Sequence, residues 1–263
     1  MLGKLLKYDL KWIYKLLVIF YCLALVFALI GRGLGRIENS TLFDVLSQIA
    51  NGFAISMAVS AVINCVMRAW ARFHINIYKD ESYLTHTLPI SKNTIYFSKV
   101  LSAILCTLTT VIVAVICLAI CYYSKENLEM IKTSLELAAS TFDSTVVNLL
   151  LIISAVVFFE VLFILQIGYN GLIIGHRSNK GKMIKSIIIA FVMYMAVNGL
   201  SLAVIFAAGL LNNDISYIIT TNEFVNPEII KIIMFLAIAM YFVYNVAFYF
   251  IGKWQLNKGV NVD

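Results

Sequence analysis

The chain has 263 residues, of which 62% are hydrophobic and 13% are charged, with a formal net charge of +6. Soluble globular domains are closer to roughly 45–50% apolar and 25% charged, so this composition excludes an ordinary soluble domain. The charges lie in short segments between long apolar runs, so the positive balance reports membrane topology and does not indicate a nucleic-acid partner.

Helices are the regular structure that fits these apolar runs. Backbone groups in hydrocarbon must be satisfied within the protein, which leaves helices or closed barrels, and no segment alternates apolar and polar residues as a barrel strand does. A helix needs about 20 residues to cross the hydrocarbon core. We therefore predict an all-α, polytopic membrane protein with a single transmembrane domain over residues 1–263 and six spans, at about 12–31, 45–67, 100–124, 144–175, 186–213 and 232–252.

The first segment, MLGKLLKYDLKWIYK, is typical of an amphipathic helix that lies along the inner surface of a membrane. Its lysines form one stripe, which would face anionic headgroups; they are Lys4, Lys7, Lys11 and Lys15. Asp9 falls on the apolar stripe instead, beyond the reach of any lysine of its own helix. It either pairs with a cation from another segment, such as Arg68 or Arg72, or faces water where the helix frays.

The distribution of Lys and Arg predicts the orientation. Fifteen of the twenty basic residues lie in the N-terminal segment up to Lys15, in the second and fourth connections, or in the C-terminal tail. Because cytoplasmic segments carry an excess of basic residues, we predict that both termini are cytoplasmic. The third connection, about 125–143, would then lie on the outer side, and we predict a short amphipathic helix there.

The second connection contains YKDESYLTHTLPISKNTIYFSK, which predicts a short helix outside the membrane. Asp80 can cap this helix, with Glu81 in its positive first turn, and Pro89 ends it by about Leu88. Ser91 is placed to cap the third span. The short helix would present an apolar side that either docks into a partner's groove or lies on the membrane; its residues are Tyr83, Leu84 and Leu88.

Glu160 is the one ionisable side chain deep inside a predicted span. A charge there costs roughly 2.5–3.5 kcal/mol on insertion scales, so such side chains usually face the protein interior or a wet cavity. Two interpretations remain open. Glu160 either makes a structural hydrogen bond or lies on a translocation path; its possible hydrogen-bond partners are Gln48, Asn51 and Asn198.

The fourth connection, GHRSNKGKMIKS, is basic and only superficially similar to a phosphate-binding loop. Gly175 and Gly181 are separated by five residues, and Met183 stands where Ser or Thr would bind magnesium, so we predict no nucleotide site. Gly171 and Gly175 predict close packing of two helices, more readily within one chain than between two. The three histidines show no metal-ligand spacing; they are His74, His86 and His176.

A family resemblance rests on the opening LLKYDLKW, the segment DESYLTHTLPISKNTIYFSK and six spans in about 260 residues. Together these resemble the membrane subunits of ABC-2 type transporters, most closely the small Gram-positive permeases associated with peptide export or resistance. The resemblance implies a plasma-membrane permease that exports an amphipathic substrate, a peptide or a lipid-like molecule. It also implies a second permease copy, identical or not, and two copies of a separate cytoplasmic ATPase that binds ATP and magnesium.

The resemblance also implies site residues. In that family the loop between the second and third spans supplies a coupling helix that sits in a cleft of the ATPase. The corresponding residues here are Asp80, Glu81, Tyr83, Leu84, Thr85 and Leu88. The basic loop with Arg177, Lys180 and Lys182 would be a second, weaker contact. No catalytic residue, metal or cofactor is expected in this chain itself.

Two other classes of function stay open at this stage. A secondary transporter would work alone on an ion gradient, although such proteins tend to have broken helices, repeated halves and several intramembrane charges. A membrane scaffold or sensor would bind a cytoplasmic partner without transporting anything.

Overall fold

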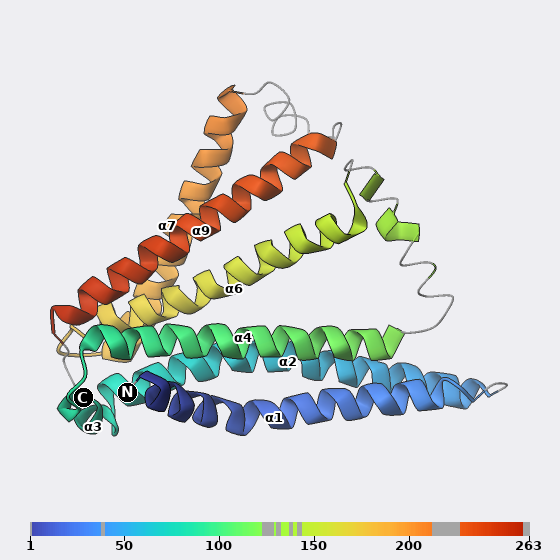
Figure 1. The fold of residues 1–263 in the computed structure, drawn as a ribbon, viewed down its shortest axis with the longest axis horizontal. Helices are drawn as coiled ribbons and strands as arrows, with labels where there is room; N and C mark the ends of the chain where they lie inside the picture. Colours follow the sequence, from blue (N-terminus) through green and yellow to red (C-terminus); the bar gives the residue numbers. More distant parts are fainter. Residues whose placement is uncertain are drawn as a thin grey trace. The chain divides into compact units, whose positions relative to one another are not determined.

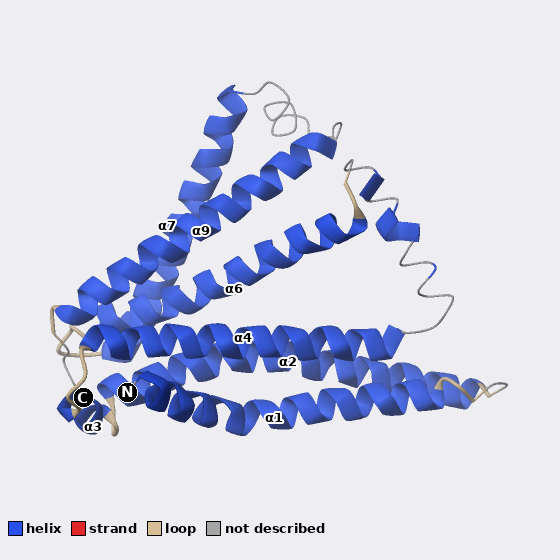
Figure 2. Cartoon of the chain, in the orientation of Figure 1, coloured by secondary structure: helices blue, strands red, loops and turns tan. Residues whose placement is uncertain are grey.

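The computed structural model describes residues 2–37, 40–122, 129, 133–136, 139–140, 144–211 and 227–259. Every element of regular structure in these ranges is a helix, as Figure 2 shows. A short helix, α3 (Ser82–Thr87), follows α2 along the chain (Figure 1). The long helices are α1 (Leu2–Leu34), α2 (Thr41–Tyr78), α4 (Lys92–Tyr122), α6 (Val146–Gly175), α7 (Lys182–Leu211) and α9 (Pro227–Asn257).

These six long helices have the length and apolar composition needed to cross a membrane. Each overlaps one predicted span, so the prediction of a helical, multi-pass membrane protein is confirmed. The ends of the third and fifth predicted spans, 123–124 and 212–213, and most of the helix predicted at 125–143 lie outside the described residues.

Most of the long helices run further than their predicted spans, and α1 and α2 do so by the most residues. The N-terminal segment is not a separate surface helix but the first turns of α1, which continues unbroken for 33 residues, about 50 Å. The reason is that Asp9, Ile13 and Leu17 follow one another on a single buried face. Similarly, α2 continues past residue 67 to Tyr78, because its polar residues Arg72 and Asn76 are buried against other parts of the chain and do not interrupt the helix.

The described helices divide into two compact units, one with α1 to α4 and one with α6 to α9. In the first unit α1, α2 and α4 all pack against one another. Small side chains let the three backbones approach closely: the Cys117 thiol donates to the carbonyls of Ala24 and Ala54, at 3.6 and 3.7 Å. The prediction of one transmembrane domain stays a prediction.

In the second unit α6 packs against both α7 and α9. The α6–α9 contact is aromatic, with the Phe163 ring 5.7 Å from the rings of Tyr241 and Phe248. It is also polar, because Gln166 donates to the Asn245 side chain at 3.0 Å. Helix α6 approaches α7 closely at Gly171 and Gly175. The close helix packing that these two glycines predict is therefore confirmed, and it occurs within one chain.

Gly175 provides a test of this α6–α7 contact. A Cβ atom at Gly175 would collide with the backbone of Ser186, whereas one at Gly199 in α7 would meet nothing within 4 Å. We expect Gly175→Ala to lower the stability of the protein by roughly 1–3 kcal/mol, as overpacking does, and Gly199→Ala to leave it nearly unchanged. Thermal unfolding in detergent, followed by circular dichroism, measures both variants; equal melting temperatures would contradict the packing described.

Candidate functional site

A buried ion network occupies one end of the first unit. Asp9 of α1 is only 1% exposed. Its Oδ1 accepts from the Arg72 Nε of α2 at 2.9 Å and from the Lys99 Nζ of α4 at 2.6 Å. The Ser98 hydroxyl donates to Oδ2 at 3.3 Å. Asp9 therefore joins all three long helices of the unit. Of the two possibilities for Asp9, an ion pair or exposure to water, the ion pair is present, and Arg72 is one of its cations.

Lys99 is as deeply buried as Asp9, with a side chain 2% exposed. Its ammonium also donates to the side-chain oxygen of Asn76 in α2. A buried ammonium is tolerable only when it is paired and its protons are satisfied. Asp9 and Asn76 provide those contacts, so the position of Lys99 depends on residues from two other helices.

Glu81 extends the network to the short helix α3. Its Oε2 accepts from the Arg72 Nη1 at 2.7 Å and from the Asn76 Nδ2 at 2.9 Å. The Glu81 side chain is 40% exposed, whereas that of Arg72 is 9% exposed. Two acids and two bases thus form one neutral cluster, with Glu81 as the member nearest to solvent.

Arg68, the other cation considered for Asp9, has a different partner. Its guanidinium lies over the ring of Trp12 at 3.8 Å and donates to the Trp12 carbonyl oxygen at 2.6 Å. This contact adds a second link between α1 and α2, because a guanidinium over an indole face is favourable. The stripe opposite Asp9 is exposed as predicted, with Lys4, Lys7, Lys11 and Lys15 on the surface.

The short helix α3 differs in two details from its prediction. Asp80 does not cap it: the capping position belongs to Glu81, whose carboxylate makes no capping bond because it is engaged by Arg72 and Asn76. Thr85 is buried, with its hydroxyl donating to the Glu81 carbonyl at 2.9 Å, so it lies away from the exposed side. The buried position of Thr85 therefore does not support its predicted role in docking. The predicted cap on α4 is present, since the Ser91 hydroxyl accepts from the Thr94 amide at 3.2 Å.

The outer side of α3 is apolar and exposed. Tyr83 is 77% exposed, Leu84 67% and Leu88 43%. His86 fixes the other side of the helix to the end of α2, with its Nε2 3.1 Å from the Ile77 carbonyl oxygen. An apolar surface of this kind, held on a rigid base, is suited to bind another protein.

The remaining predicted site residues lie in the second unit. Arg177 is exposed and donates to the Gln255 carbonyl at 2.6 Å, which fastens the end of α6 to α9. Lys180 is exposed and Lys182 is half-buried at the start of α7. Glu160 is half-buried in the middle of α6. Asn198, one of its possible partners, donates instead to the Tyr194 carbonyl.

Sequence reasoning missed Lys99, Ser98 and Asn76 as members of the network. In the sequence, Lys99 is one of the basic residues of the second connection that predict the orientation of the chain. A usable signal was present, since Asp9 and Lys99 both lie just outside predicted spans on the same predicted side of the membrane. Within the described residues, no three His, Cys, Asp or Glu side chains gather as a metal site would require.

Comparison with models of known protein families, with curated proteins and with solved structures found no match to this chain.

The network makes a strong prediction for Asp9. We expect Asp9→Asn to destabilise the protein by roughly 3–5 kcal/mol, because it leaves the buried charges of Arg72 and Lys99 without their shared carboxylate. The matched control is Asp44→Asn at the exposed start of α2, which should have little effect. Thermal unfolding in detergent measures both variants.

A double variant sharpens this test. In Asp9→Asn with Lys99→Gln, the loss should be smaller than the sum of the two single losses, since removal of both partners leaves less uncompensated charge. Strict additivity, or an Asp9→Asn protein as stable as Asp44→Asn, would contradict the network.

Proposed function

We propose that this chain is the permease subunit of an ATP-driven exporter of the ABC-2 type, which moves an amphipathic substrate out of the cytoplasm. The observation that carries the proposal is α3, a short helix that exposes Tyr83 and Leu84 while its base is tied into the long helices. The resemblance of the segment around α3 to the coupling loop of that family supports the same function.

The ATP-binding partner would dock on the exposed side of α3. The exposed side of α3 would enter a cleft in a cytoplasmic ATPase, and that cleft would be filled by Tyr83, Leu84 and Leu88. The basic loop with Arg177 and Lys180 would be a weaker second contact on the same side of the membrane. The working assembly would contain two permease chains and two ATPase subunits, with ATP and magnesium bound by the ATPases.

The network explains how motion of the ATPase would reach the membrane. A displacement of α3 pulls on Glu81, and Glu81 is bonded to Arg72 and Asn76. Arg72 shares Asp9 with Lys99, so α1, α2 and α4 move with α3 as one body. Rigid coupling of this type converts closure of a partner into movement of membrane helices.

The distribution of Lys and Arg along the chain supports the orientation that this mechanism requires. Both termini, α3 and the Arg177 loop would be cytoplasmic, and the protein would reside in the plasma membrane with its spans in lipid. A gradient-driven transporter is the second candidate, favoured by one observation: Glu160 lies half-buried in the middle of a membrane-crossing helix. A non-transporting scaffold or sensor is the third.

Capture of partners from native membranes tests the proposal. The tagged chain, purified in mild detergent, should retain a protein with a phosphate-binding loop. Leu84→Asp should abolish that capture, because a carboxylate on the exposed side of α3 cannot enter an apolar cleft.

The matched control is Leu42→Asp, which introduces the same charge at a similarly exposed leucine at the far end of α2. Capture should survive this change. Recovery of no nucleotide-binding protein would defeat the proposal and favour the gradient-driven transporter, whose transport should persist without ATP and collapse with an ionophore. Capture of a partner without a nucleotide site would favour the scaffold.

A further inference from the structure

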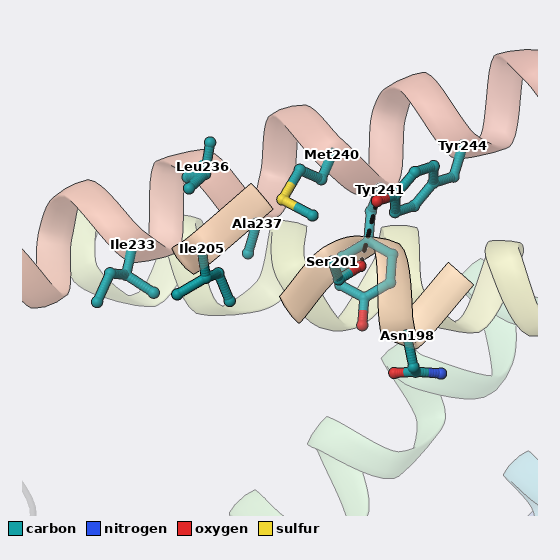
Figure 3. Close-up of a pocket in the computed structure, with 9 residues that line it drawn as sticks. All are labelled: Asn198, Ser201, Ile205, Ile233, Leu236, Ala237, Met240, Tyr241 and Tyr244. Atoms are coloured by element: carbon teal, nitrogen blue, oxygen red, sulfur yellow. Dashed lines mark hydrogen bonds between the residues drawn. The ribbon is translucent and has the colours of Figure 1, made fainter. Parts of the chain in front are cut away.

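A pocket lies between α7 and α9 in the second unit, with a volume of about 130 Å³. Figure 3 shows that its two ends differ in chemistry. One end is aliphatic, lined by Ile205, Ile233 and Leu236. The other is polar and aromatic, lined by Asn198, Ser201, Tyr241 and Tyr244. The pocket is therefore amphipathic, although both helices are apolar enough to lie in a membrane.

The polar end is partly organised already. The Ser201 hydroxyl and the Tyr244 hydroxyl are hydrogen-bonded at 3.2 Å. The Asn198 amide donates to the Tyr194 carbonyl within α7 at 2.8 Å, which leaves its oxygen as an acceptor. The ring of Tyr241 is fixed by the Phe163 ring of α6 at 5.7 Å. Contacts within the chain thus fix the positions of these side chains.

An acidic side chain, Glu160 of α6, lies in the helix that packs against this polar end. It lies three residues before Phe163, whose ring contacts that of Tyr241, and directly after Phe159 in the part of α6 that contacts α9. The Phe159 carbonyl beside it accepts from Asn245 of α9 at 3.0 Å, which fixes the register of the two helices here. Among the described residues, no cation forms an ion pair with Glu160.

We propose that this pocket binds the head of a lipophilic organic cation, an ammonium group on a hydrocarbon chain. A carboxylate in a membrane helix is stabilised by a cation, and aromatic faces such as those of Tyr241 and Tyr244 also attract ammonium groups. The aliphatic end around Ile233 and Leu236 accepts the first carbons of the chain. An anionic amphiphile of the same shape is repelled by Glu160.

The size of the pocket defines how much of the ligand it holds. About 130 Å³ accommodates roughly four groups the size of a water molecule. The head and the adjoining carbons therefore fit, and the rest of the chain extends out of the pocket along the apolar faces of α7 and α9. A bulky head with large substituents does not fit.

This site narrows the substrate of the proposed exporter to cationic amphiphiles, and that assignment rests on the proposed function. The binding site itself does not. If the ATPase is captured and no cation binds, the site is wrong and the exporter stands; if cations bind and no ATPase is captured, the exporter is wrong and the site stands.

The test is equilibrium dialysis of isotopically labelled octyltrimethylammonium against the full chain in nanodiscs of phosphatidylcholine, with empty nanodiscs as the blank for lipid partition. We expect saturable binding to the chain above the blank. Glu160→Gln should weaken it by roughly tenfold to a hundredfold, the range for loss of a contact with a charged group. Octyl sulfate, which has the same chain and the opposite charge, should show no saturable binding.

Two further variants separate binding from folding. Asp44→Asn removes an exposed acid at the start of α2 and should bind the probe like the unmodified chain. Ala237→Phe fills the pocket while Glu160 stays in place, and it should also abolish binding. Binding that is unchanged in both Glu160→Gln and Ala237→Phe, or that equals the blank in the unmodified chain, would overturn the proposal.

Discussion

The carboxylate of Asp9 lies between the guanidinium of Arg72 and the ammonium of Lys99, and all three side chains are shielded from solvent. A buried charge that loses its partner costs several kcal/mol. The helices α1, α2 and α4 therefore have one register in which these charges meet. A slip of one helical turn, about 5.4 Å, would separate them. The remaining contacts of the first unit form in the register that this pairing requires.

Packing further along the same helices is consistent with that register. Cys117 of α4 reaches the carbonyls of Ala24 and Ala54 only because small side chains let the three backbones converge there. At the charged end, Glu81 continues the network outwards to α3. The same interactions that stabilise the unit thus give α3 a rigid base, and a rigid base is what a docking helix needs if it is to transmit force.

Periodicity and composition predicted much of this fold, and tertiary packing decided the rest. Six apolar runs predicted the long helices, and the position of Asp9 on an apolar stripe left two possibilities, an ion pair with another segment or exposure to water. The sequence places Lys99 on the same predicted side of the membrane as Asp9, but it does not establish their contact, because that depends on which turns of α1 and α4 meet. The predicted Asp80 cap is wrong for a similar reason. The capping position of α3 belongs to Glu81, whose carboxylate is held by Arg72 and Asn76 of α2, and the local sequence around α3 does not reveal these contacts.

Glu81 fastens α3 to the long helices through Arg72 and Asn76. Amide hydrogen exchange of residues 82–87, measured by mass spectrometry on the purified chain, tests it directly. Glu81→Ala removes the bonded carboxylate, and Asp80→Ala removes its exposed neighbour as the matched control. We expect markedly faster exchange of α3 in Glu81→Ala and little change in Asp80→Ala. Equal exchange in the two variants would contradict it.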